Sequence, residues 1–532
     1  MPAHKVLTTS ALSVAAVSAL LLSGVSSAAT ISPGQSNRAL VPSTAPIAGQ
    51  NAGLQAMPLT SRVHVSVFIG RDRADLAAAA AAISNPRSPR YQHYLSPAQA
   101  RAAFTVKQQC SVYYGQKKAS TLPAAFGKTL SWAPCGYLPQ QLRSAYGATR
   151  SGLTGRGVSV AILSEDNDST ALSDTNHWAR DRHFPPFKPG QFVPNIAKHA
   201  FNGVGDIESA LDVESVHGMA PAARVNYVVG NGSITGDRLL DALDTVVTYR
   251  IATVVSSSWF EGYMPVPNSM ITAWEGVLQR ATVEGIGVNF ATGDFGDETP
   301  LQYPGSDPWI TLVGGTSIAV GKRGNTLWEA GWETDQANLS KNGQSWKPAP
   351  PGFFSEGSTG GVSKTFPEPF YQQGVVSHNV RNGTPMRVVP DISALGDWNL
   401  GYQIGVSIPV GHHQVKYFNQ MNGGTSLSSP MLTGFEADAI QGRGGISLGF
   451  ANPALYDYAN TPTYNDITGN PQGRGVTEAT VFGIGYQEPP QLSVMGQCGD
   501  THHLACGVGY DTVSGLGSPG PAFFKSFGSK PR

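Results

Sequence analysis

From about residue 138 onward, short apolar runs alternate with segments whose apolar residues recur every three or four positions. The short runs predict buried strands, and the longer segments predict helices that pack on them. Strands that are apolar almost throughout and alternate with helices indicate a parallel sheet covered on both faces. The predicted strands are Val158–Leu163, Arg224–Val229, Thr253–Ser258, Gly287–Ala291 and Trp309–Val313, and the predicted helices are Asp206–His217, Gly236–Tyr249, Ser269–Glu284 and Met431–Ile440.

The pattern differs before this region and within two later segments. Residues 30–56 are rich in Ser, Pro, Gly, Asn and Ala, which is typical of a linker. An alternating strand at residues 62–71, a helix at 75–83 and a second helix opened by Ser96 and Pro97 are expected next. The Gly- and Pro-rich stretch 325–366 and much of 470–509 are expected to be surface loops.

The first 29 residues have the pattern of a secretory signal peptide. Lys5 precedes an apolar run from Ala11 to Val25, and small residues follow as far as Ala29. The run is short for a membrane span, and no other stretch approaches the roughly 18 apolar residues that one needs. The sequence therefore predicts an exported, extracellular protein that is not held in a membrane.

Charge and cysteine content narrow the function further. Lys and Arg total 36, as do Asp and Glu, so the formal net charge is zero, which argues against a nucleic-acid binder. Charged residues make up 14%, against about 25% in typical globular domains. The low content of charged residues fits a protein that works in an acidic environment, although a sequence rich in small residues explains it equally well. Four cysteines allow three pairings, and proximity favours Cys110–Cys135 and Cys498–Cys506.

One serine stands in a setting suited to a nucleophile. Ser426 lies in the run GGTSLSSP, residues 423–430, directly before a helical pattern. A turn of small residues can present its hydroxyl at a helix N-terminus, where N–H dipoles favour negative charge. The alternative is an ordinary capped helix start.

Two groups of carboxylates could serve that serine. Glu208 and Asp212 are four residues apart, so they share one helical face, where two acids can share a proton. Asp294 follows an apolar strand in a Gly-Asp-Phe-Gly turn, and when protonated it could donate a hydrogen bond to an oxyanion. The alternatives are a solvated helix face and a common loop residue. His217, at the end of the predicted helix, is the one candidate for a histidine base, although a capping cation is the simpler interpretation.

Together these motifs resemble the sedolisin family of serine-carboxyl peptidases, relatives of kumamolisin and the tripeptidyl-peptidases. The matching stretches are GDIESALDVESVHGMAPAARV, GVNFATGDFGD, YPGSDPWITLVGGTS, GGVSKTFPEPFYQ, RVVPDISALGD and NGGTSLSSP. The resemblance implies an α/β fold with a subtilisin-like parallel sheet flanked by helices, and a small α+β prodomain. It implies Ser426 as nucleophile, Glu208 as base and acid, Asp212 as its partner and Asp294 as oxyanion donor.

The resemblance also implies a domain order and one calcium ion. Residues 57–136 would be a short activation propeptide with its junction, and residues 137–532 the catalytic domain with a C-terminal calcium site. Calcium prefers carboxylate and carbonyl oxygens. The implied ligands are Asp466, Ile467, Gly507, Gly509 and Asp511. A glycine-rich turn with incidental acids is the alternative.

The sequence thus predicts a secreted, acid-active serine-carboxyl peptidase that forms an acyl-enzyme on protein or peptide substrates. Its own propeptide would be an intramolecular inhibitor, and a monomer is expected, with neither nucleic acid nor membrane as a partner. Endopeptidase and tripeptidyl-peptidase action both stay open. The alternatives are a subtilisin-type serine peptidase that uses His217 and an inactive, peptidase-like binding protein.

Overall fold

The structure is a computed structural model, and it describes residues 80–94, 110–231, 238–411, 414–468, 478–482, 490–496 and 504–529. The chain divides into a smaller unit, residues 1–106 with 409–415, and a larger unit, residues 107–408 with 416–532. In the smaller unit, residues 80–84 are helical and a series of turns follows as far as Tyr94. The predicted signal peptide, linker, strand 62–71 and second helix lie outside the described residues.

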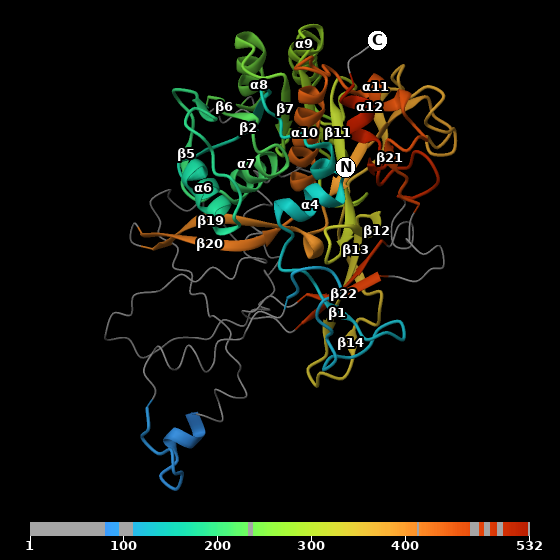
Figure 1. Ribbon diagram of the computed structural model, residues 1–532. Coiled ribbons are helices and arrows are strands. Elements are labelled where there is room, and N and C mark those ends of the chain that lie inside the picture. Colours follow the sequence, from blue (N-terminus) through green and yellow to red (C-terminus); the bar gives the residue numbers. More distant parts are fainter. Residues whose placement is uncertain are drawn as a thin grey trace, which may run out of the picture. The chain divides into compact units, whose positions relative to one another are not determined.

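A mostly parallel sheet forms the core of the larger unit (Figure 1). Its strands are β2 (Ser159–Ser164), β4 (Phe192–Ile196), β6 (Arg224–Val229), β7 (Val254–Ser257), β9 (Gly287–Ala291), β11 (Thr311–Val320), β12 (Thr326–Gly331) and β18 (Ile392–Leu395). They follow the order β12-β11-β9-β7-β2-β6-β4, and β18 also pairs with β11. Only the pair of β11 with β12 is antiparallel among these. The predicted α/β class is confirmed, and all five predicted strands are present.

Helices cover both faces of this sheet because neighbouring residues of each strand point to opposite sides. Ala161 and Leu163 of β2 pack in one cluster with α8 (Arg238–Tyr249) and α9 (Asn268–Val283). Val160 and Ile162 pack in another with α7 (Ile207–Met219) and α10 (Thr425–Gly442). Figure 1 shows α8 and α9 side by side. The predicted helices are therefore confirmed, and α10 extends further than predicted at both ends.

The helices α7 and α10 lie very close together where they cross. A Cβ atom built on Gly434 of α10 would lie 2.6 Å from the Cβ atom of Met219 on α7. Real Cβ atoms essentially never approach so closely, so the crossing depends on the missing side chain. This contact matters because α7 carries Glu208 and Asp212 and α10 carries Ser426, three of the predicted catalytic residues.

A second sheet corrects the prediction that residues 325–366 form surface loops. Its strands are β1 (Ser131–Trp132), β13 (Glu333–Leu339), β14 (Trp346–Lys347), β15 (Phe353–Gly357), β22 (Glu478–Phe482) and β23 (Gln491–Met495). They follow the order β1-β22-β23-β13-β14, with β15 also on β13. The prediction failed because these strands carry polar residues inward: Glu333, Thr334 and Asp335 are all buried. Two of these strands also lie within 470–509.

The remaining elements lie outside these two sheets, and their strands form two-stranded pairs. The helices are α4 (Pro139–Ala145), α5 (Ala148–Ser151), α6 (Ala171–Asp181), the 3-10 turn η1 (Trp398–Leu400), α11 (Asn452–Asp457) and α12 (Phe523–Phe527). The strands are β3 (Asn167–Asp168), β5 (Asn202–Gly203), β8 (Gly262–Tyr263), β10 (Gln302–Tyr303), β16 (Gly361–Pro367), β17 (Met386–Val389), β19 (Tyr402–Gly411), β20 (Gln414–Asn422), β21 (Tyr464–Asn465) and β24 (Ser518–Pro519).

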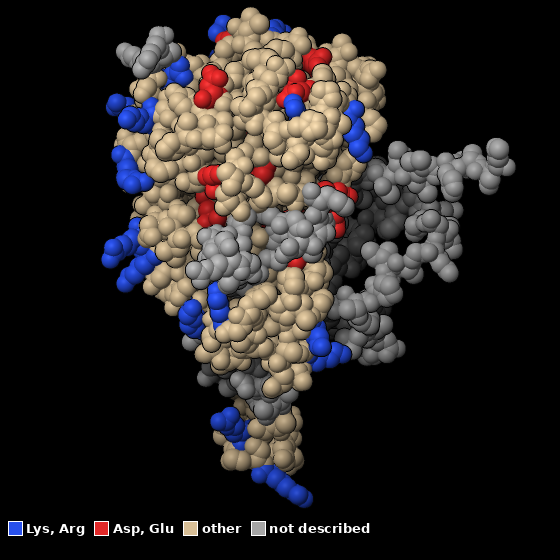
Figure 2. Space-filling model, turned by 90° about the vertical axis from the view of Figure 1, so that its right-hand side faces the viewer, with Lys and Arg blue, Asp and Glu red and all other residues tan. Residues whose placement is uncertain are grey.

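The disulfides and the sparse surface charge fit the cysteine and charge content of the sequence. The predicted pairing of Cys110 with Cys135 is confirmed, with the two Cα atoms 5.1 Å apart. Cys506 is also disulfide-bonded, and its predicted partner, Cys498, lies outside the described residues. Charged side chains are sparse on the face shown in Figure 2, where most of the described surface is uncharged. None of the helices in the described part of the chain combines the length and apolarity needed to cross a bilayer.

Candidate active site

The first turn of the acidic helix α7 is fixed by the helix's own N-cap residue. The Asp206 carboxylate accepts hydrogen bonds from the backbone N–H groups of Glu208 at 3.2 Å and Ser209 at 3.1 Å. Such a cap satisfies N–H groups that have no partner inside the helix. It fixes the first turn, which carries Glu208, and Asp212 follows one turn later with no exposed surface. The predicted shared face of the two acids is therefore present.

The helix that carries Ser426 begins at a glycine in a conformation that few other residues adopt. Gly424, the N-cap of α10, has φ +96°, and Ser426 lies in the first helical turn. A Cβ atom built on Gly424 would lie 2.8 Å from Oδ2 of Asp294. Glycine is needed at position 424 for two reasons. It allows the turn before Ser426, and it leaves space for a carboxyl group from another strand.

Asp294 lies against the start of α10. Its Oδ1 atom accepts hydrogen bonds from the backbone N–H of Thr425 at 2.8 Å and from the Thr425 hydroxyl at 2.9 Å. Burial raises the pKa of Asp294 above its ordinary range, and these two hydrogen bonds only partly offset the rise. Because both donors use Oδ1, the other oxygen is the atom available to carry a proton.

The Ser426 hydroxyl lies near enough to the Glu208 carboxyl to stabilise its ionised form and so lower its pKa, but burial has the larger effect. Burial raises the pKa of the Glu208 carboxyl, and nearby Asp206 and Asp294 raise it further. Burial also raises the pKa of Asp212, and repulsion from Glu208 adds to that rise. Two buried acids that repel each other hold a proton between them at pH values where exposed acids have lost theirs. The structure thus brings Glu208, Asp212, Asp294 and Ser426 into one cluster.

Ser258 is a member of this cluster that the sequence did not reveal. It follows β7, and its hydroxyl lies 2.6 Å from Oδ1 of Asp212. The same hydroxyl oxygen is 3.2 Å from the carbonyl oxygen of Ser426. A serine after an apolar strand is too common to stand out, and no spacing rule links it to residues 46 and 168 positions away.

His217 lies apart from this cluster. The centroid of its ring lies 4.0 Å from that of Phe187 with the planes tilted by 41°, and Nε2 bonds to the carbonyl oxygen of Pro185 at 2.7 Å. Burial lowers the pKa of His217 to about 4, so the imidazole is neutral above that pH. The expectation of a capping cation was therefore wrong, because the helix end that carries His217 is buried among aromatic rings.

Four of the five predicted calcium ligands, Asp466, Gly507, Gly509 and Asp511, lie close together. Gly509 N–H lies 3.1 Å from each carboxylate oxygen of Asp466, and Gly507 N–H lies 3.1 Å from Oδ2 of Asp511. Asp511 is 2% exposed, and its Oδ1 atom accepts from the backbone N–H groups of Val513 and Ser514 and from the Ser514 hydroxyl. Within the described residues there is no group of three or more His, Cys, Asp or Glu side chains that could hold a metal.

Buried acids should also make the fold more stable in acid than at neutral pH. Glu436 of α10 is 2% exposed and accepts a hydrogen bond from the side-chain amide of Asn289 at 2.6 Å. Burial raises its pKa from 4.5 to about 7. As pH rises, the unfolded chain releases this proton first, so each such group lowers the unfolding free energy by up to about 1.4 kcal/mol per pH unit between these values.

This prediction is checked by thermal unfolding of the Ser426→Ala chain from pH 4 to pH 9, which avoids self-digestion. The melting temperature should be highest near pH 4 and should fall between pH 4.5 and 7. Glu436→Gln removes one titrating group and should make that fall shallower. A melting temperature that rises across this interval would contradict the prediction.

The chain is similar in sequence to a known family and to individual peptidases. The model of the Subtilase family matches residues 155–451, which include Glu208, Asp212, Asp294 and Ser426. Tripeptidyl-peptidase sed5 of Aspergillus fumigatus is 29% identical over 263 residues, covering 46% of this chain and 38% of that protein. Sedolisin of Pseudomonas sp. (strain 101) is 25% identical over 386 residues, covering 67% and 58%. The chain therefore spans between about 38% and 58% of the length of these relatives.

A solved structure is similar over most of the larger unit. It is Pseudomonas sedolisin, a serine-carboxyl proteinase, complexed with two molecules of pseudo-iodotyrostatin. The TM-score is 0.53 at 22% identity, and the match covers 74% of this chain and 99% of that one. This likeness confirms the predicted subtilisin-like sheet. The chain belongs to the Subtilase family, and its relatives assign it to the sedolisin branch of that family.

Proposed function

We propose that this chain is a secreted, acid-active serine-carboxyl peptidase that cleaves peptide bonds through an acyl-enzyme on Ser426. The observation that carries the proposal is the proximity of the Ser426 hydroxyl to the Glu208 carboxyl inside a buried acidic cluster, where the hydroxyl favours the ionised carboxyl. A hydroxyl is a weak nucleophile until a neighbouring base takes its proton. In this site the base in contact is a carboxyl group, whereas His217 is bonded to Pro185.

The proposed reaction moves one proton back and forth. Glu208 accepts the proton of Ser426 as the hydroxyl oxygen attacks the substrate carbonyl carbon, and Asp212 shares the charge of the pair. The protonated Glu208 then donates to the leaving amine nitrogen, which releases the first product and leaves an ester on Ser426. In the second half, Glu208 accepts a proton from water as the water oxygen attacks the ester, and it returns that proton to the Ser426 oxygen as the second product leaves.

Asp294 would stabilise the tetrahedral intermediate. Its protonated Oδ2 faces the Gly424 position, beside the nucleophile, and can donate a hydrogen bond to the developing oxyanion. Losing one such donor costs about 3 kcal/mol in the transition state, which corresponds to a rate loss of roughly 100-fold or more. This role requires a neutral carboxyl group, and the raised pKa of Asp294 supports it. Acid conditions therefore suit the site.

The change Asp294→Ala should lower kcat by about 10² to 10³ and change KM little, because the lost bond forms only in the transition state. Asp294→Asn keeps a donor at every pH. Its remaining activity should therefore extend further toward neutral pH than that of the wild type. Steady-state kinetics from pH 3 to 8 on one fluorogenic peptide would check both variants. Full activity in Asp294→Ala would rule out this role.

Calcium is proposed as a structural ion at the predicted ligands described above. The carboxylates of Asp466 and Asp511 flank residues 507–509, and two carboxylates with backbone carbonyls suit a cation that prefers oxygen ligands. The carbonyls of Ile467, Gly507 and Gly509 would complete the protein's share. The ion would hold the C-terminal segment to the strand β21 region and take no part in bond cleavage.

Removing calcium should therefore destabilise the fold. At a calcium concentration of 100 times Kd, binding adds about 2.7 kcal/mol to the unfolding free energy. A chelator should lower the melting temperature of the Ser426→Ala chain, and calcium should restore it. Asp511→Asn should lose this response while it keeps its fold. An identical melting temperature with chelator and with calcium would exclude the site.

Export and self-inhibition belong to the same proposal. The signal-peptide pattern of residues 1–29 supports export, and the N-terminal region that follows it would serve as the propeptide. Substrates would be proteins or peptides, and a monomer is expected.

One experiment tests the activity directly. The purified chain and its Ser426→Ala variant are incubated with a peptide library across pH 2 to 8, and the products are identified by mass spectrometry. Cleavage below about pH 5 by the wild type alone is expected. Tripeptide products would indicate tripeptidyl-peptidase action, and internal cuts would indicate an endopeptidase. No cleavage at any pH would leave the inactive binding protein as the better interpretation.

A further inference from the structure

The Ser258 side chain lies between the Glu208–Asp212 pair and the backbone of Ser426. Its Oγ atom is 2.6 Å from Oδ1 of Asp212 and 3.2 Å from the carbonyl oxygen of Ser426. The second oxygen of Asp212, Oδ2, is buried and has no hydrogen-bond partner among the described residues. The orientation of the Asp212 carboxyl therefore depends on the bond from Ser258.

A serine hydroxyl has only one proton to donate. When Asp212 is ionised, the shorter distance directs that proton to its Oδ1 atom. When Asp212 carries a proton on Oδ1, the carboxyl becomes the donor and the Ser258 oxygen the acceptor. The hydroxyl proton of Ser258 is then released toward the carbonyl oxygen of Ser426. The two arrangements conserve the number of protons and differ only in which acceptor the hydroxyl faces.

We propose that Ser258 is a positioning residue that orients Asp212 and links its protonation to the backbone of Ser426. The inference rests on the proposed peptidase function and adds a role for a residue outside the four predicted ones. Ser258 need not touch the substrate to act. Its donation to ionised Asp212 favours loss of a proton by the Glu208–Asp212 pair, which leaves Glu208 free to act as base at lower pH.

The variant Ser258→Ala should lower kcat about 10-fold and leave KM within about twofold. The acid limb of the kcat/KM profile should move up by about one pH unit, because the hydrogen bond from Ser258 stabilises ionised Asp212 and its loss raises the pKa of the acid pair. Ser258→Thr keeps the hydroxyl and should restore both values. Ser257→Ala is the matched control, because the Ser257 hydroxyl bonds only to Trp259 in the described contacts.

The outcomes separate this role from simple packing and from a failure of the proposed function. Wild-type cleavage that Ser426→Ala abolishes establishes the function first. With that in place, an unshifted acid limb in Ser258→Ala would overturn the positioning role, even if the rate fell. Equal losses in Ser258→Ala and Ser258→Thr would also overturn it, since the hydroxyl would then not be the cause.

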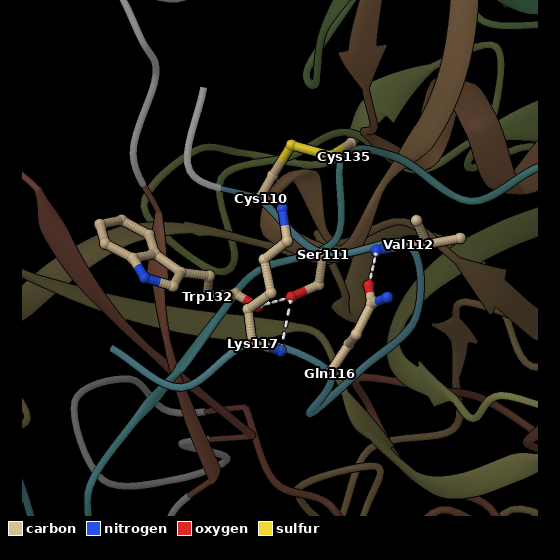
Figure 3. Close-up of a disulfide and its surroundings, with 7 residues drawn as sticks. All are labelled: Cys110, Ser111, Val112, Gln116, Lys117, Trp132 and Cys135. Carbon is tan, nitrogen blue, oxygen red and sulfur yellow. Dashed lines mark hydrogen bonds between the residues drawn. A yellow bond between two sulfur atoms is a disulfide. The ribbon is translucent and has the colours of Figure 1, made fainter. Parts of the chain in front are cut away.

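A separate observation concerns residues 110–136, here called the N-terminal arm. The disulfide between Cys110 and Cys135 closes the arm on itself (Figure 3). Inside it, the Ser111 hydroxyl donates to the carbonyl oxygen of Trp132 at 2.9 Å, and the N–H of Lys117 donates to that hydroxyl at 3.3 Å. The arm is therefore an ordered element with its own cross-links.

The arm is also built into the larger unit. Its strand β1 pairs with β22 at the edge of the second sheet, with Trp132 opposite Val481. The N–H of Tyr114 donates to the carbonyl oxygen of Val320 at 3.0 Å, and the indole N–H of Trp346 donates to that of Pro123 at 3.0 Å. Its apolar side chains share a core cluster with the second sheet: Ala119, Ala125, Leu130 and Trp132 pack with Ala337, Trp346, Leu492 and Val494.

The structure assigns the N-terminal arm to the mature peptidase, with the activating cut upstream of Cys110. This differs from the boundary at residues 136 and 137 that the sequence predicted. Loss of the arm would uncover Trp346, Leu492 and Val494, which are now 4%, 0% and 0% exposed. It would also leave β22 as an unpaired edge. Exposed apolar patches and free edges both promote aggregation.

The test uses the full-length Ser426→Ala chain, so that its result does not depend on the proposed activity. Limited digestion with an unrelated protease should give a resistant core whose non-reduced mass still includes residues 110–136. A chain that begins at residue 107 should match this core in melting temperature. A chain that begins at residue 137 should melt at least several degrees lower or aggregate. A resistant core without the arm, or equal melting temperatures for the two chains, would overturn the assignment.

Discussion

Replacing Ser426 with alanine should reduce peptide cleavage by about 10⁴-fold or more while the melting temperature stays close to that of the wild type. The loss is large because the acyl-enzyme cannot form without the hydroxyl, and the remaining site can only orient water. In subtilisin, removal of the nucleophile costs about 10⁶ in kcat, which sets the scale for a site on this fold. The measurement is kcat/KM on a fluorogenic peptide near pH 4.

The matched control is Ser429→Ala, three residues further along α10. The Ser429 hydroxyl lies 3.1 Å from that of Ser256 and contacts no member of the acidic cluster in the described bonds. The Ser429→Ala variant should keep most of the activity, because the hydroxyl that it loses is buried in the same helix but does not contact the acidic cluster. Turnover by Ser426→Ala at the wild-type rate would end the proposed mechanism, whatever the control shows.

The second large effect is expected for Glu208→Gln, which keeps the size of the side chain and removes its basicity. General base catalysis contributes about 10² to 10⁴ in rate, and in the proposed mechanism this residue also returns the proton to the leaving group. We therefore expect a loss of about 10³-fold or more in kcat across pH 3 to 7. No pH should restore it, because an amide does not titrate in this range.

His217→Gln gives the discriminating comparison for Glu208→Gln. The imidazole of His217 bonds to Pro185 and packs among aromatic rings, so its loss should lower stability and leave the chemistry intact. If His217→Gln abolished turnover in a folded protein and Glu208→Gln did not, the subtilisin-type alternative would replace the proposed mechanism.

The sequence predicted the main sheet well because its strands are buried on both faces. Runs such as Arg224–Val229 and Gly287–Ala291 are apolar almost throughout, and the structure places both strands at the predicted bounds. The second sheet was missed for the opposite reason. Strand β13 buries the polar residues Glu333, Thr334 and Asp335. The Thr334 hydroxyl, for example, donates to Asp397 at 3.5 Å across 63 residues. No local pattern contains that information.

The candidate site could be predicted only in part. Helical spacing places Glu208 and Asp212 on one face, but only the fold brings that face to Ser426, which is 218 positions after Glu208 in the sequence. Ser258 and Thr425 were not predicted, since single hydroxyl residues are common and their roles depend on which carboxyl group lies opposite. The position of the N-terminal arm depends likewise on β22, which comes about 350 residues later.

The crossing at Gly434 makes the spacing of the reactive groups depend on a residue that touches none of them. Ser426 and Glu208 lie on separate helices. Gly434, eight positions beyond Ser426, has no side chain, and this sets how closely the two helices approach. Even one methyl group there would have to push them apart. A substitution at this position could therefore abolish activity while the reactive residues are all retained. Their presence in a distant relative would not by itself show that the relative is active.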